Sequence, residues 1–98
     1  MNYSFLEPAR DELEEAVTYY EGQRQGLGEE FAQEVENTIQ RILNLPAAWS
    51  PLAPNIRRCR TNRFPYGLVY TVRAEEIIIV AVKHLRRKPG YWTKRLAE

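Results

Sequence analysis

The chain has 98 residues and a formal net charge of +1, with 44% hydrophobic and 28% charged side chains. This length predicts one domain, residues 1–98, and the hydrophobic fraction favours a folded globule over a disordered chain. A single cysteine excludes an intramolecular disulfide, and no apolar run approaches the roughly 20 residues that a membrane-spanning helix needs. The N-terminal residues lack the apolar segment of a secretory signal, so we expect a cytoplasmic protein with no membrane partner.

The net charge conceals an asymmetry between the two halves of the chain. Residues 1–48 carry ten acidic and three basic side chains, whereas residues 49–98 carry three acidic and eleven basic ones. This division predicts a polarised surface with one strongly cationic face. Acidic solvated helices beside a basic strand region would give the same charges, so the pattern alone leaves both interpretations open.

The first half of the chain predicts a short strand followed by a helical hairpin. Residues 3–6 are rich in β-prone side chains, and Pro8 suits the first turn of a helix, where its missing N–H is not needed. Two apolar stripes with helical spacing follow, separated by a break at residues 22–26 and ended by Pro46. The first stripe comprises Ala9, Leu13, Ala16, Val17 and Tyr20, and the second comprises Leu27, Phe31, Val35, Ile39, Ile42 and Leu43.

The second half changes to the period of two that is typical of strands. Residues 46–54 are rich in proline and predict a loop, and strands are predicted at 56–61, 64–73 and 77–84. Alternation places Arg58 and Arg60 on one face of the first of these strands. The complete pattern predicts an α+β domain of order β-α-α-β-β-β, a small, largely antiparallel sheet with an N-terminal helical hairpin packed on one face.

The last predicted strand raises a question about the other face of the sheet. Its run "IIIVAV" is apolar on both sides, which is typical of a strand that is covered on both sides. Two helices cover only one face. Either a curved sheet closes on its own loops and tail, or the second face carries apolar surface that awaits a partner.

The sequence gives little support for a metal, cofactor or nucleophile site. One histidine and one cysteine are too few for a zinc site, and no glycine-rich phosphate loop is present, so we expect no metal and no cofactor. Cys59 is expected to be a small buried residue and His84 a structural histidine. A set of cations with interleaved aromatic residues suits either single-stranded RNA or an acidic protein segment. This set comprises Arg57, Arg58, Arg60, Arg63, Lys83, Arg86, Arg87 and Lys88, with Tyr66, Tyr91 and Trp92.

Three motifs carry a resemblance to a known family. They are "YYEGQRQGLGEEF" at 19–31, "RFPYGLVY" at 63–70 and "HLRRKPGYW" at 84–92. Together, and over nearly the whole chain, they resemble the RelE/ParE superfamily of toxins from bacterial type II toxin–antitoxin modules. The resemblance implies a toxin that is held inactive by a co-encoded, cognate antitoxin protein, with operator DNA contacted only through that antitoxin.

The superfamily divides by target, and the resemblance implies different site residues for each subgroup. RelE-like members cleave mRNA on the ribosome, and their catalytic set would correspond here to Arg58, Arg60, His84 and Tyr91. ParE-like members inhibit DNA gyrase without RNA chemistry, and target-binding residues would then be Arg63, Arg86, Arg87, Tyr91 and Trp92.

Two positions favour the ParE-like subgroup. Gly67 and Leu85 stand where the nucleases carry two further arginines. Cations at these positions would stabilise the charge that develops on a phosphate during cleavage, so their loss would raise the barrier considerably. The sequence therefore predicts a gyrase inhibitor, with a ribosome-dependent, metal-independent endoribonuclease as the alternative.

Overall fold

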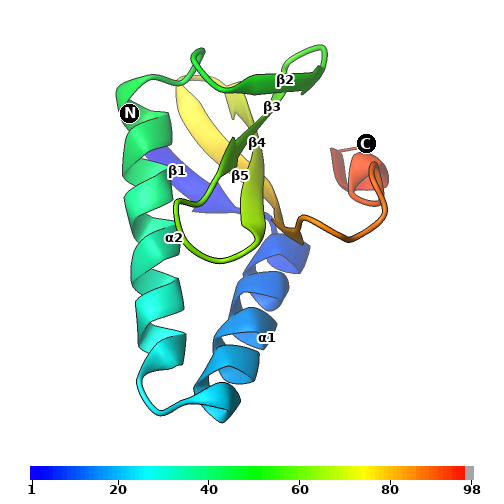
Figure 1. Ribbon diagram of the computed structural model, residues 1–98. Helices are drawn as coiled ribbons and strands as arrows, with labels where there is room; N and C mark the ends of the chain where they lie inside the picture. The colour runs from blue at the N-terminus through cyan, green and yellow to red at the C-terminus, as the bar shows by residue number, and fades with distance from the viewer. Residues whose placement is uncertain (97–98) are drawn as a thin grey trace.

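The computed structural model describes residues 1–96, which form a five-stranded sheet with a helical hairpin on one face (Figure 1). The sheet order is β1-β5-β4-β3-β2, in which only β1 and β5 are parallel. The predicted α+β fold with an N-terminal helical hairpin is confirmed. The elements are β1 (Asn2–Phe5), α1 (Glu7–Gln23), α2 (Leu27–Asn44), β2 (Ser50–Ala53), β3 (Ile56–Arg60), β4 (Tyr66–Arg73), β5 (Glu76–His84) and the 3-10 helix η1 (Thr93–Leu96).

The two predicted apolar stripes face the sheet. Phe31, Val35 and Ile39 of α2 are at most 2% exposed, and Ala9 and Ala16 of α1 are buried in the same core. Burial of these side chains is the main force that holds the hairpin on the sheet, because isolated helices of this length are marginally stable in water.

Glu21 and Gly28 explain the sequence "GLG" between the helices. The Glu21 carboxylate accepts hydrogen bonds from the backbone N–H groups of Gly26 and Gly28 at 3.0–3.1 Å, and so caps the start of α2. A Cβ on Gly28 would lie 2.6 Å from the carbonyl oxygen of Val17. Glycine at this position therefore allows α1 and α2 to approach closely.

One predicted loop contains a strand that the sequence analysis missed. Ser50–Ala53, inside the predicted loop 46–54, pairs antiparallel with β3 at the edge of the sheet. Pro51 is compatible with this position because an edge strand needs partners on one side only. All four residues of β2 are exposed, so no buried alternation marks the strand in the sequence.

A bulge in β5 places two consecutive residues of its apolar run on the same face of the sheet. Val69 is opposite Ala81 and Tyr70 is opposite Ile79, which leaves Val80 as the extra residue. Ile79 packs in the helix-side core, whereas Val80 and Ala81 both pack in a second core on the opposite face.

The tail that follows β5 supplies the cover for this second core. Trp92 is 6% exposed and packs with Ile56, Val69, Val80 and Ala81, and Leu6, Tyr91 and Leu96 lie against the same cluster. In Figure 1 the tail leaves the end of β5 and places η1 beside the sheet, on the side opposite α2. Of the two possibilities raised by the sequence, closure by the chain's own tail accounts for this part of the second face.

The β4–β5 hairpin turns through two residues in the left-handed region. Ala74 has φ 49° and Glu75 has φ 62°, and the flanking pair is Arg73 with Glu76. A two-residue turn with positive φ at both positions is the type I′ turn, which strongly prefers asparagine and glycine. Alanine and glutamate adopt this conformation only at a cost in free energy.

We therefore expect Glu75→Gly to raise the free energy of unfolding by about 1 kcal/mol, because glycine adopts a positive φ without steric cost. The midpoint of urea denaturation measures the effect. Glu76→Gly is the matched control, since Glu76 is in an extended strand where glycine is expected to destabilise the fold. Equal midpoints for the two variants would contradict this account of the turn.

Candidate functional site

Glu12 of α1 lies at the centre of a hydrogen-bonded cluster that joins the first helix to the tail. Its carboxylate accepts hydrogen bonds from the Tyr91 hydroxyl at 2.7 Å, from Arg95 at 2.8 Å and from Arg87 at 3.0 Å. It also accepts the backbone N–H of Val82 at 3.0 Å, next to the bulge. The Glu12 side chain is only 10% exposed. We call Glu12, Arg87, Tyr91 and Arg95 the Glu12 cluster.

The Glu12 cluster fixes the protonation of its members. Burial alone would raise the pKa of Glu12, but hydrogen bonds from Arg95, Tyr91 and Val82 outweigh it and hold this pKa below its usual value. Burial raises the pKa of Tyr91, and the hydrogen bond to the Glu12 carboxylate raises it further. Tyr91 therefore stays protonated near neutral pH, with its O–H donated to Glu12.

The ring of Tyr91 is also occupied by neighbouring cations. The guanidinium carbons of Arg87 and Arg95 lie 3.7 and 5.0 Å from its ring centroid. Such contacts stabilise the tail through cation–π attraction. They also cover the aromatic surface that a nucleic-acid base would need for stacking.

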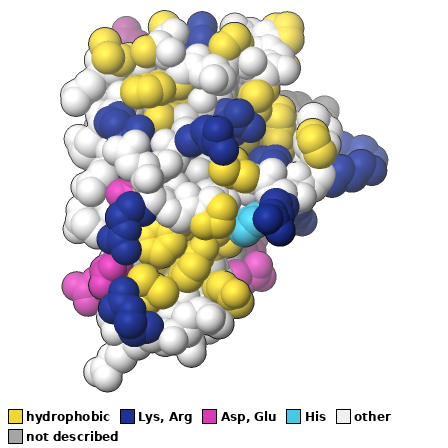
Figure 2. Space-filling view, viewed as in Figure 1, with side chains coloured by type: hydrophobic (Ala, Val, Ile, Leu, Met, Phe, Trp, Pro, Cys, Tyr) yellow, Lys and Arg dark blue, Asp and Glu magenta, His cyan; other side chains and the backbone are white. Residues whose placement is uncertain are grey.

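His84 lies on the helix side of the sheet. Its ring packs edge-on against Tyr66, with the two ring centroids 5.1 Å apart, and its Nδ1 accepts the backbone N–H of Arg86 at 3.1 Å. In Figure 2 the histidine borders an exposed hydrophobic area on one side and Lys and Arg side chains on the other.

Arg58, Arg60 and Lys83 lie on the opposite face of the sheet, on either side of Gly67. Arg60 and Lys83 are the two cross-strand neighbours of Gly67, and Arg58 is opposite Val69 of the second core. A Cβ on Gly67 would lie 3.1 Å from Cγ and Cδ of Arg58, so glycine gives the Arg58 stem room to cross β4. We call Arg58, Arg60 and Lys83 the cationic face.

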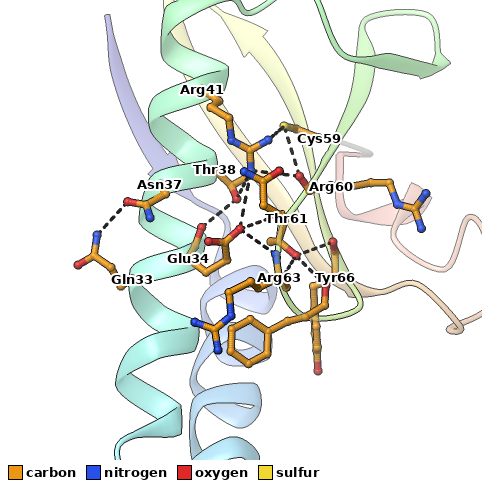
Figure 3. A network of polar contacts seen from close by, with 12 residues as sticks. Gln33, Glu34, Asn37, Thr38, Arg41, Cys59, Arg60, Thr61, Arg63 and Tyr66 are labelled. Atoms are coloured by element: carbon orange, nitrogen blue, oxygen red, sulfur yellow. Dashed lines mark hydrogen bonds and ion pairs between the residues drawn. The ribbon is translucent and has the colours of Figure 1, made fainter.

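Arg63 lies apart from the tail, beside α2. Its guanidinium pairs with Glu30 at 3.0 Å and lies 4.9 Å from the ring centroid of Phe64. The backbone N–H of Arg63 donates to the buried carboxylate of Glu34, which belongs to a polar network between α2 and the loop after β3 (Figure 3). The predicted target-binding residues thus divide between two places in the fold.

The buried cysteine belongs to the same network. Cys59 is 0% exposed, and Arg41 donates to its sulfur at 3.7 Å (Figure 3). Burial raises the pKa of this thiol, although the charge of Arg41 opposes the effect. A thiol with a raised pKa is a poor nucleophile at neutral pH, in keeping with the expected role of Cys59 as a small buried residue.

Within residues 1–96, no group of three or more histidine, cysteine or acidic side chains could hold a metal ion. None of the helices in this part of the chain is long and apolar enough to cross a membrane.

Comparison with known proteins identifies the family. A family model described as the ParE toxin of type II toxin–antitoxin system, parDE, matches residues 3–89. The chain belongs to this family. This ParE-family chain is therefore a toxin of a type II toxin–antitoxin system, for which the family implies an antitoxin partner. The predicted RelE/ParE membership, with the ParE-like subgroup favoured, is confirmed.

A solved structure supports the fold of this ParE-family toxin. A chain from the chromosomal ParDE TA system from P. aeruginosa has a TM-score of 0.63 and 16% sequence identity, and the match covers 87% of this chain and 96% of that chain. At this identity the likeness concerns the fold alone. A search of curated proteins found no match.

Two members of the Glu12 cluster were absent from the sequence predictions. Glu12 lies within the acidic run 11–15, which is typical of a solvated helix face, and Arg95 lies in the tail beyond the last predicted strand. Their contact joins positions 83 residues apart. No local pattern connects them.

Proposed function

We propose that this toxin acts by docking on DNA gyrase and performs no RNA chemistry. The observation that carries the proposal is the separation of the groups that a nuclease would need. Arg58 and Arg60 lie on one face of the sheet, His84 lies on the other, and the hydroxyl of Tyr91 donates to Glu12. General acid–base catalysis needs its groups within hydrogen-bond reach of one substrate, so this distribution supports a binding role.

Exposed cations of the tail are the proposed contacts with the target. Arg86 and Lys88 are exposed, and Arg87 is half exposed although it pairs with Glu12. Exposed cations at the rim of an interface accelerate association with an acidic surface. Trp92 is buried, so its proposed contribution is to hold the tail on the sheet.

The purified toxin is expected to inhibit DNA supercoiling by gyrase and to leave mRNA intact in a translation extract. Arg86→Glu should raise the half-inhibitory concentration about tenfold, which corresponds to about 1.4 kcal/mol of binding free energy. Arg10→Glu, an exposed charge reversal on α1, is the matched control and should leave inhibition unchanged. Cleavage of mRNA on the ribosome that disappears in Arg58→Ala, with gyrase unaffected, would reverse the proposal in favour of a nuclease.

A further inference from the structure

The cationic face lacks counter-charges within the described part of the chain. The ion pairs formed among residues 1–96 involve Arg24, Arg41, Arg63, Arg87 and Arg95, and none includes a member of the cationic face. Lys83 is nevertheless only 5% exposed, and its Nζ donates to two carbonyl oxygens of its own strand end at 3.2 and 3.4 Å. Charged groups that are withdrawn from water are normally paired.

The surroundings of Lys83 disfavour the protonated, charged form of its side chain. Burial lowers the pKa of Lys83, and the positive charges of Arg58 and Arg87 lower it further. An anion bound beside Lys83 would remove this penalty, because an opposite charge favours the protonated amine.

Two buried N–H groups on the same face also lack acceptors. Arg58 Nε and Trp92 Nε1 are buried and have no hydrogen-bond partner. Both lie on the second face of the sheet, because Arg58 is opposite Val69 and Val69 belongs to the same buried cluster as Trp92. Trp49 Nε1, in the helix-side core, is also unpaired, so the indole groups alone identify no ligand. Buried donors are nearly always satisfied in folded proteins, and the unpaired Nε of Arg58, a member of the cationic face, therefore indicates a missing acceptor on that face.

We propose that Arg58, Arg60, Lys83 and Trp92 form a binding site for a carboxylate from an acidic segment of a protein partner. Arginine can bind both carboxylate oxygens, and the lysine and indole N–H groups supply further donors. Ile56 and Trp92, which are 8% and 6% exposed, belong to the buried second core on the same face of the sheet. The site is distinct from the proposed gyrase contacts, which are Arg86, Arg87 and Lys88 of the tail.

Nucleic acid fits this face less well than protein. Single-stranded nucleic acid is bound through exposed aromatic rings and a continuous track of cations. Trp92 is buried, the ring of Tyr91 is covered by Arg87, and Arg87 and Arg95 both pair with Glu12. Of the cationic face Arg60 is exposed, Arg58 is half-buried and Lys83 is buried, which suits one carboxylate better than a continuous chain of phosphates.

The two tryptophans of the chain provide the test. Trp49 and Trp92 each give one indole N–H signal in a ¹H–¹⁵N NMR spectrum, and Trp49→Phe assigns them. Trp49 packs in the helix-side core and serves as an internal reference. The probes are a blocked five-residue peptide of alternating leucine and glutamate, the same peptide with glutamine in place of glutamate, and single-stranded hexathymidylate.

We expect the glutamate peptide to shift the Trp92 signal saturably while Trp49 stays in place, and the glutamine peptide to have no effect. Arg58→Gln and Lys83→Met should each weaken binding of the glutamate peptide at least tenfold, whereas Lys94→Gln, an exposed change on η1, should not. An unchanged Trp49 signal in the variants shows that the fold is retained. A Trp92 signal that fails to respond, responds equally to the glutamine peptide, or responds more strongly to hexathymidylate would overturn the proposal.

Discussion

Replacing Phe31 with alanine is expected to lower the free energy of unfolding by about 3–5 kcal/mol. Phe31 is 0% exposed, and its ring centroid lies 5.1 Å from that of Tyr20, 5.1 Å from that of Phe64 and 4.9 Å from that of Tyr66. It therefore joins α1, α2 and β4 in one aromatic cluster. Truncation would leave a cavity that three different elements line, and rigid elements cannot readily collapse to fill it.

This loss is large because small domains have total stabilities of about 5–15 kcal/mol. The midpoint and slope of urea denaturation, followed by circular dichroism, measure the effect. Phe31→Leu is the matched control, which keeps most of the side-chain volume and should cost about 1.5 kcal/mol or less. An unchanged midpoint for the alanine variant would show that the α2 stripe does not face the sheet.

The helical hairpin could be predicted from the sequence because its apolar residues repeat with the helical period. Phe31 and Ile39 are buried as that period requires, and Pro46 follows the end of α2. Alternation also placed Arg58 and Arg60 correctly on one face of β3, as the pairing with β4 confirms. Periodicity is informative wherever one face of an element is buried and the other is solvated.

The other features of the fold leave no periodic pattern in the sequence. β2 is exposed along its whole length, so Ser50–Ala53 looks like a loop. The bulge at Val80 is hidden in a run of apolar residues, where a shift of one position leaves the pattern unchanged. The cover over the second core depends on Trp92, which is distant in sequence from Ile56 and Val69. These features follow from long-range packing rather than from local preference.

The candidate site shows the same division between local and long-range information. The sequence pointed to cations near Tyr91, but it could not show that Arg87 pairs with Glu12 or that Arg95 joins the same carboxylate. It also placed His84 and Tyr91 in one hypothetical set with Arg58. The pleat of β5 directs His84 to the helix side instead, and Glu12 binds the Tyr91 hydroxyl.

Glu12→Gln is expected to lower the free energy of unfolding by about 3 kcal/mol at neutral pH, because removing one partner of a buried ion pair leaves the other charge uncompensated. The partner most affected is Arg95, whose side chain is 16% exposed, whereas Arg87 is 53% exposed and can be hydrated. Loosening of the tail should also expose Trp92 to water, which shifts its fluorescence to longer wavelength.

The effect of Glu12→Gln should depend on pH in a defined direction. The pKa of Glu12 is lower in the folded state than in the unfolded chain, so the carboxylate contributes its stability above the unfolded pKa of about 4.3. That contribution is lost as the pH falls through the folded pKa. The difference in stability between wild type and Glu12→Gln should therefore be constant from neutral pH to about pH 5.5 and should shrink in stronger acid.

Glu30→Gln is the matched control for Glu12→Gln. Glu30 also pairs with two arginines, Arg24 at 3.2 Å and Arg63 at 3.0 Å, but its side chain is 39% exposed. Solvent screens an exposed pair, so this variant should unfold at nearly the wild-type urea concentration. If both variants lose the same stability, or if the loss in Glu12→Gln persists unchanged below the folded pKa of Glu12, then the buried carboxylate does not hold the tail through its charge. If the two behave as expected, Glu12 stabilises the cover over the second face, and the position of Trp92 depends on a residue of the first helix.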